Sequence, residues 1–113
     1  MIDLSFNLEE FIKSIEESIK DAKIRIIDRE CNLLALVIGE DVYLVQCRPC
    51  KVKGYMYVKI APAHVYHRWS CEVVEYLPYG FYIFSKQLNE LIDKLINKIN
   101  TLRKLMSRIS IEV

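Results

Sequence analysis

The fold of this chain is decided by one alternating stretch, Lys51-Val52-Lys53-Gly54-Tyr55-Met56-Tyr57-Val58-Lys59-Ile60. Successive side chains of a β-strand point to opposite faces, so the two halves of this alternation separate in space. The basic and aromatic residues share one face: Lys51, Lys53, Tyr55, Tyr57 and Lys59. The apolar residues share the other face: Val52, Met56, Val58 and Ile60. The stretch therefore predicts a strand with one face in a core and the other toward solvent.

Lysines that alternate with aromatic rings on an exposed strand suit a single-stranded nucleic acid. Ammonium groups neutralise phosphates, and aromatic rings stack on unpaired bases. The ordinary alternative is an exposed strand in which tyrosine is favoured by β-propensity and lysine by solubility or edge protection. The pattern favours binding without excluding that alternative.

Basic charge is concentrated around this stretch, although the whole chain carries a formal net charge of only +1. From Val42 to Cys71 there are five Lys or Arg residues and no Asp or Glu, which leaves −4 for the rest of the chain. Five of the twelve aromatic residues lie in the same segment. Such a cluster favours a nucleic-acid partner, and an acidic protein is the other partner it could face. The candidate nucleic-acid contacts are Arg48, Lys51, Lys53, Tyr55, Tyr57, Lys59, Tyr66, His67, Arg68 and Trp69.

Composition predicts a single domain over residues 1–113, because 52% of the residues are hydrophobic and Gly and Pro number only three each. No apolar run approaches the roughly 20 residues that a bilayer span requires. The first residues lack the basic and apolar regions of a signal peptide, so we expect a cytoplasmic protein without membrane contact. Abundant Ile and charged residues with only two Gln are typical of thermophile proteins.

A helix is predicted from Leu8 to Ala22, capped by Asn7, because apolar residues recur there at helical spacing. Short strands in an antiparallel meander are predicted after it, since the connections between them are brief. These strands are Lys23–Asp28, Leu33–Ile38 (covered on both faces), Val42–Cys47, the Lys/Tyr strand up to Ile60, and Trp69–Leu77. The segment Phe81–Phe84 is predicted to be either a short strand or an apolar plug.

The last third of the chain is predicted to be one long helix over 85–110, with Ser85 as its N-cap. Its apolar residues follow a regular heptad, with Ile or Met at a and Leu or Ile at d, as in leucine-zipper coiled coils. The seam residues expected to pair with another copy are Leu88, Ile92, Leu95, Ile99, Leu102, Met106 and Ile109. We expect the first turns to pack on the sheet and the later turns to form a homodimer or tetramer.

A helix, a basic-aromatic antiparallel sheet and a long leucine-heptad helix together resemble ThermoDBP and the ThermoDBP-related single-stranded nucleic-acid-binding proteins of hyperthermophilic archaea. The resemblance covers most of the chain as a layout, and it implies a non-catalytic, oligomeric single-strand binder. The run from Lys53-Gly54-Tyr55-Met56-Tyr57 through Tyr79-Gly80-Phe81 into Leu88-Asn89-Glu90-Leu91 is also similar to the transcription coactivator positive cofactor four. That second likeness covers only half of the chain, which has Leu77-Pro78-Tyr79-Gly80 where the family has a Pro-Gly-Lys-type loop.

Cysteines and histidines raise a rival hypothesis, because Cys47-x-x-Cys50, His64-x-x-His67 and Cys71 are the residue types of a structural zinc site. The His spacing is one residue shorter than in common zinc fingers, so we predict no metal and no cofactor. Disulfides are a further alternative, and for Cys31 and Cys71 buried free thiols are the favoured interpretation.

Motifs for catalysis are absent from the sequence: it has no Gly-rich phosphate loop, no Gly-x-Ser-x-Gly and no His-Glu-x-x-His. Four carboxylates at expected strand ends could form a nuclease cluster but are more often turn residues: Asp28, Glu30, Glu40 and Asp41. We predict that the protein is not an enzyme.

The sequence therefore predicts an α+β domain with an N-terminal helix, an antiparallel sheet of four to five strands and a long C-terminal leucine-heptad helix. The predicted function is binding of single-stranded DNA, or RNA, by the basic-aromatic sheet face or a cleft beside it. The alternatives are a protein-interaction module that dimerises through its C-terminal helix, and a small zinc-binding domain.

Overall fold

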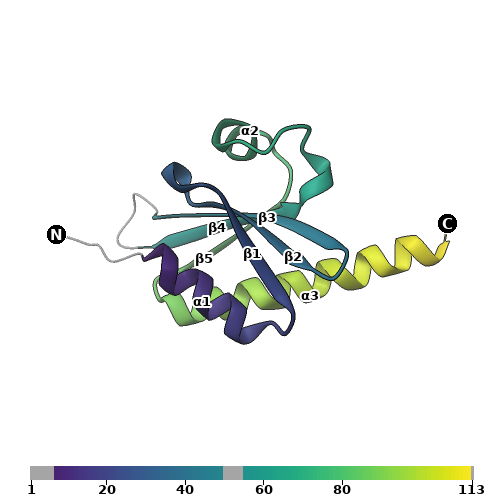
Figure 1. Cartoon of the computed structure of the whole chain (residues 1–113), viewed down its shortest axis with the longest axis horizontal. Coiled ribbons are helices and arrows are strands. Elements are labelled where there is room, and N and C mark those ends of the chain that lie inside the picture. The colour runs from purple at the N-terminus through teal and green to yellow at the C-terminus, as the bar shows by residue number, and fades with distance from the viewer. Residues whose placement is uncertain (1–6, 50–54, 113) are drawn as a thin grey trace.

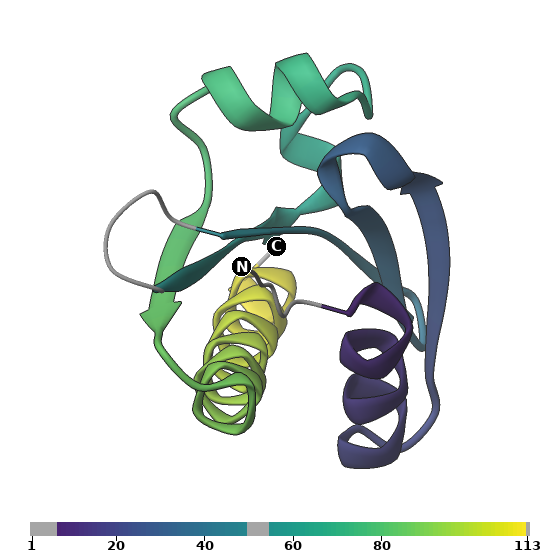
Figure 2. The ribbon, with the colours of Figure 1, turned by 90° about the vertical axis from the view of Figure 1, so that its left-hand side faces the viewer.

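Five strands form one antiparallel sheet that lies between two long helices and a short helix (Figures 1 and 2). The computed structural model describes residues 7–49 and 55–112, with side chains for 7–47 and 55–105. The strand order β1-β2-β3-β4-β5 follows the chain, so the predicted meander is confirmed. The strands are β1 (Ala22–Asp28), β2 (Leu33–Ile38), β3 (Asp41–Pro49), β4 (Met56–Pro62) and β5 (Phe81–Ser85). The fold is α+β, as the sequence predicts.

Helix α1 (Leu8–Ser18) begins where the sequence predicts and ends earlier. The side chain of Asn7 accepts a hydrogen bond from the backbone N–H of Glu10 at 3.2 Å, which caps the first turn. Ile19 is already extended, and Asp21 takes a positive φ of 67° that turns the chain into β1. The expected extension of this helix to Ala22 is therefore wrong.

One face of the sheet packs on α1 and on helix α3 (Leu88–Glu112), which Figure 2 shows side by side beneath the strands. Alternate residues of every central strand point into this core, as strand periodicity requires. Val58 and Ile60 of the Lys/Tyr stretch are fully buried there, so the predicted core face of β4 is confirmed. The strand contributions to this core include Leu34, Leu36, Tyr43, Val45, Val58, Ile60 and Ile83.

Most of the heptad seam of α3 is buried against the sheet and α1 of the same chain. Leu102 is 5% exposed, and Ile92, Leu95 and Ile99 are buried as well. Ile92 and Leu95 pack on the sheet and α1, as expected for the first turns, whereas the expectation that Ile99 and Leu102 face another copy is wrong, because the same core covers them. Leu88 is half-buried, while the side chains of Met106 and Ile109 lie outside the described residues.

The last turns of α3 nevertheless run past the edge of the sheet (Figure 1). The helix starts at Leu88 rather than at Ser85, whose hydroxyl accepts a hydrogen bond from the N–H of Gln87 at 3.1 Å. Within the described residues, none of the helices combines the length and the apolar composition that crossing a membrane requires.

The opposite face of the sheet is covered in part by the turn η2 (Ala63–Val65) and by helix α2 (Cys71–Tyr76). The predicted strand over Trp69–Leu77 is wrong: the Ser70 hydroxyl accepts a hydrogen bond from the N–H of Val73 at 3.3 Å and caps a helix. Val74 packs from this helix onto a second apolar cluster of the sheet. β-branched residues favour strands only weakly, and this cap with its apolar contact outweighs that preference.

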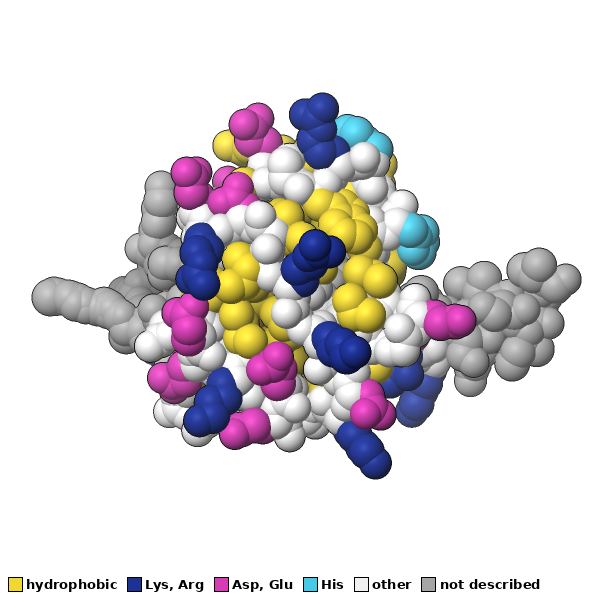
Figure 3. All heavy atoms as spheres, in the orientation of Figure 1, with side chains coloured by type: hydrophobic (Ala, Val, Ile, Leu, Met, Phe, Trp, Pro, Cys, Tyr) yellow, Lys and Arg dark blue, Asp and Glu magenta, His cyan; other side chains and the backbone are white. Residues whose placement is uncertain are grey.

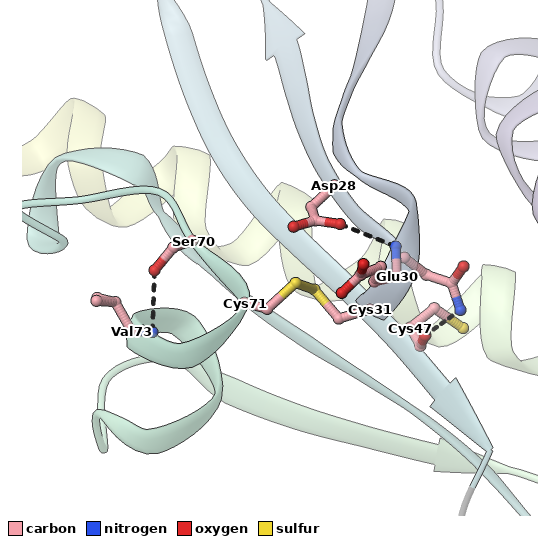
Figure 4. The surroundings of a disulfide bond; sticks show 8 residues. Asp28, Glu30, Cys31, Cys47, Ser70, Cys71 and Val73 are labelled. Carbon is pink, nitrogen blue, oxygen red and sulfur yellow. Dashed lines mark hydrogen bonds between the residues drawn. A yellow bond between two sulfur atoms is a disulfide. The ribbon is translucent and has the colours of Figure 1, made fainter.

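A disulfide joins Cys31 to Cys71, with a Cα–Cα distance of 5.9 Å (Figure 4). It ties the first residue of α2 to the turn η1 (Arg29–Cys31), where the Asp28 carboxylate accepts a hydrogen bond from the Glu30 N–H at 2.9 Å. The prediction of buried free thiols at these two positions is wrong, because the meander brings residues 40 positions apart into contact.

Candidate nucleic-acid interface

Three aromatic rings lie together on the part of the sheet face that α2 leaves open. Tyr57 comes from β4, Tyr82 and Phe84 come from β5, and Tyr57 pairs with Phe84 in the β4–β5 ladder. The ring centroids are 5.8 Å apart for Tyr57 and Tyr82, 6.0 Å for Tyr57 and Phe84, and 6.4 Å for Tyr82 and Phe84. Tyr82 and Phe84 are 50% and 49% exposed, and Tyr57 is half-buried. We call these three residues the aromatic platform.

The alternation within β5 creates this arrangement. Ile83 and Ser85 point toward α3 and are buried. Tyr82 and Phe84 alternate with them along the strand and therefore point to the opposite face. The sequence predicts either a short strand or an apolar plug here, and neither Tyr82 nor Phe84 is among the predicted contacts. The signal was present, because an aromatic residue at every second position beside a strand with exposed tyrosines predicts a shared face.

Lys59 lies on the expected face of β4, but its expected solvent exposure is wrong: the residue is 1% exposed. Its amine donates hydrogen bonds to the backbone carbonyls of Val74 and Leu77 at the end of α2. Burial lowers the pKa of the Lys59 ammonium, and the carboxylate of Glu75 partly offsets that effect. In this arrangement Lys59 cannot contact a phosphate.

The buried Lys59 lies beside the platform, because it pairs with Tyr82 in the β4–β5 ladder and shares its face. Its Nζ lies 5.4 Å from the centroid of the Tyr82 ring and 5.9 Å from that of Tyr66. An ammonium near a ring face is attracted by the ring quadrupole, so the amine helps to hold Tyr82 in place. Its ladder partner Gln46 is fully buried, with an amide that has no hydrogen-bond partner among the described residues.

Tyr66 is also buried, at 4% exposure, so its expected role as an exposed base-stacking ring is wrong. Its hydroxyl donates a hydrogen bond to the carbonyl of Tyr79 at 2.9 Å, and burial raises its pKa to about 12. Tyr66 therefore packs η2 against the loop before β5 and is part of the second apolar cluster.

The remaining candidates of the basic segment, His67, Arg68 and Trp69, are exposed. Trp69 is 42% exposed and donates its indole N–H to the carbonyl of Ala63 at 3.2 Å. All three lie in the connection between η2 and α2, outside the two strands that carry the platform.

At the platform end of β4, Tyr55 is 39% exposed and Nζ of Lys86 lies 4.9 Å from its ring centroid. Arg48 pairs with Tyr57 in the β3–β4 ladder, although its side chain is outside the described residues. Lys51 and Lys53 belong to the segment 50–54, which is likewise outside the description. Lys86 is not among the predicted contacts, because it lies outside the basic segment from Val42 to Cys71.

Charges on the face that carries β1 and α1 are mixed, with acidic and basic side chains interspersed in Figure 3. Among the residues that the structure describes, no group of three or more His, Cys, Asp or Glu side chains could hold a metal ion. Cys47 is buried in the core between the sheet and the long helices, and Cys50 lies outside the described residues. Asp28 caps η1, and Asp41 pairs with Arg103 at 3.4 Å, so two of the four carboxylates considered for a nuclease have local structural contacts.

The platform is thus a surface of exposed aromatic rings on which other flat rings could stack, and Lys86 lies next to it over Tyr55. Comparisons of the chain with family models, with curated proteins and with solved structures found no match, so the resemblances noted in the sequence stay predictions.

Proposed function

We propose that this chain binds single-stranded nucleic acid by stacking unpaired bases on the aromatic platform. One observation carries the proposal: three rings lie within 6.4 Å of one another on an open sheet face, and two of them are about half exposed. Aromatic side chains that stack on bases contribute about 1–3 kcal/mol each, and they accept any base because every base has a π-face.

Cations close to the platform support a polyanionic ligand. Lys86 lies over Tyr55, and Arg48 is the ladder partner of Tyr57. Lys51 and Lys53 belong to the connection between β3 and β4, which are the strands that Arg48 and Tyr57 occupy. In the proposed mechanism these groups attract phosphates, while specificity for single strands comes from bases that a duplex keeps stacked inside.

Exposed rings also suit a protein partner, so the test must separate stacking from general apolar contact. Phe84→Ala removes one platform ring, whereas Phe84→Leu keeps apolar bulk without a π-face. Tyr76→Ala is the matched control, because Tyr76 is a 77% exposed aromatic residue on α2, outside the platform.

Fluorescence anisotropy with a labelled single strand should show binding by the parent and weaker binding by Phe84→Ala, by about 1–3 kcal/mol. Phe84→Leu should bind almost as weakly as Phe84→Ala, and Tyr76→Ala should bind with the affinity of the parent. A duplex of the same sequence should bind much more weakly. Equal affinity for duplex and single strand, or full affinity of Phe84→Leu, would contradict base stacking at this site.

Self-association through the last turns of α3 is a second proposal. The last turns of the helix run past the sheet (Figure 1), and Leu105, three residues after the buried Leu102, is 48% exposed. Apolar residues on an unpartnered helix face favour a second copy, in which the two helices would pack along each other.

A further inference from the structure

A shallow groove of about 430 Å³ runs along the outer edge of β5, beside α3. β5 is the last strand of the sheet and pairs only with β4 in the described structure, so this edge is not covered by another strand. The groove is lined by Tyr82, Ile83 and Phe84 from β5 and by Lys94, Asn97, Lys98 and Thr101 from α3. Two platform residues therefore also form one wall of the groove.

The charge of this groove is positive, because its lining includes two lysines and no carboxylate. Lys94 is partly neutralised by Glu90, whose Oε1 lies 3.1 Å from the Lys94 amine. Nζ of Lys98 lies 4.7 Å from the centroid of the Phe81 ring, and among the described residues no carboxylate pairs with it. Of the two groove lysines, Lys98 is therefore the one without a neutralising carboxylate among the described residues.

An open strand edge could accept a peptide strand, but the position of Lys94 opposes that occupant. Its amine donates a hydrogen bond at 2.9 Å to the backbone carbonyl of Phe84. The lysine occupies a backbone carbonyl that an added strand would need as a hydrogen-bond acceptor. Its ammonium charge would also lie in the path of that strand. The same two lysines complement an anionic chain, which needs no backbone pairing with β5.

We propose that this groove holds the sugar-phosphate backbone of the single strand whose bases stack on the aromatic platform. This inference rests on the function proposed above and assigns the path of the ligand. The backbone follows β5, and the bases turn over the strand onto Tyr82 and Phe84.

The spacing of the two sets of contacts agrees with such a path. Lys94 and Lys98 are four residues apart on a helix, which is a rise of about 6 Å. Tyr82 and Phe84 are two residues apart on a strand, and their ring centroids are 6.4 Å apart. Lys94 contacts the backbone carbonyl of Phe84 and Lys98 contacts the ring of Phe81, so α3 runs antiparallel beside β5.

The test measures how the affinity for a labelled single strand depends on salt. For single strands, log K falls against log salt with a slope of about −0.7 for each phosphate neutralised. Lys98→Gln should therefore make the slope less steep by about 0.7. Lys94→Gln with Lys98→Gln should make it less steep by about 0.7 to 1.4, because Glu90 already partly neutralises Lys94. Lys98→Arg keeps the charge and should restore the parent slope.

Lys23→Gln is the matched control, because Lys23 is an exposed lysine on β1, the opposite edge strand of the sheet. It should leave the slope unchanged, and Phe84→Ala should lower affinity with the parent slope. If the double lysine variant binds with the parent slope while Phe84→Ala binds weakly, the groove proposal is wrong and the platform proposal stands. If the parent binds no single strand even at low salt, both proposals fall.

Discussion

At the scale of single residues, the side chain of Lys59 has the largest consequence for the site. Its amine donates hydrogen bonds to two backbone carbonyls of α2 and the residue after it, and it lies near the Tyr82 ring. Lys59 therefore links the part of the sheet face that α2 covers to the part that carries the platform. A buried ammonium carries a desolvation cost that its hydrogen bonds must offset. Lys59 therefore acts on the platform through Tyr82 and α2 rather than by touching a ligand.

Gly80 is the residue whose size limits how β5 approaches β4. Its φ is +99°, and a Cβ added there would lie 2.7 Å from the carbonyl oxygen of Ile60 and 2.9 Å from Cβ of Ala61. Gly80→Ala should therefore destabilise the fold by about 2–3 kcal/mol, through backbone strain and a backbone clash.

Gly39→Ala is the control for Gly80→Ala, because Gly39 also has a positive φ, of +63°, but nothing lies within 4 Å of the added Cβ. This variant should lose only about 1 kcal/mol, the cost of a left-handed alanine. Urea unfolding of both variants measures the difference. Equal losses would show that the close approach of β5 to Ile60 contributes nothing to stability.

At the scale of elements, α2 is a short helix that depends on its attachments. Six residues are too few for a helix to be stable by itself, so it needs tertiary contacts. These contacts are the disulfide at Cys71, the apolar packing of Val74 and the hydrogen bonds from Lys59 to the end of the helix. The helix decides how much of the sheet face remains open.

The disulfide should contribute substantially to stability, because it closes a loop between residues 40 positions apart. The chain-entropy model gives about 4 kcal/mol for a loop of that length, and measured values are typically about 2–4 kcal/mol. Cys31→Ser with Cys71→Ser should lower the free energy of unfolding by that amount, measured by urea unfolding. A thiol reductant should destabilise the parent to the same degree and leave the double variant unchanged; an unaffected parent would contradict the prediction.

At the scale of the whole molecule, α3 is the longest element and sets the shape of the protein. Its 25 residues extend about 37 Å, within a molecule whose longest extent is 51 Å. Burial through Leu102 shows that one small sheet and α1 cover about the first four turns. Only the remaining turns are left for a second copy.

Leu105→Glu tests self-association without damaging the core, because Leu105 is 48% exposed whereas Leu102 is buried. If two copies pack through the last turns, the parent should sediment as a dimer at tens of micromolar and Leu105→Glu as a folded monomer. A charge in that apolar contact would lose its hydration without gaining a partner. A parent that is already monomeric at this concentration would contradict self-association through α3.

The sequence by itself determined the elements whose pattern is local. The alternation around Tyr57 and Val58 predicts β4 and its core face, and the cap at Asn7 predicts the start of α1. The meander followed from short connections, and the long apolar repeat after Leu88 predicted α3. In each case the periodicity of neighbouring residues is sufficient, because a strand or a helix is defined within its own segment.

Tertiary structure alone decided which layer covers each predicted face. Periodicity places Lys59 and Tyr57 on the same side of β4, but only the docking of α2 buries one of them and leaves the other beside an open surface. The heptad of α3 likewise predicts an apolar stripe, but it does not predict that the sheet and α1 bury this stripe as far as Leu102. The pairing of Cys31 with Cys71 depends on the same long-range packing. A local pattern specifies which residues share a face, whereas burial is settled by segments that are distant in the sequence and adjacent in the fold.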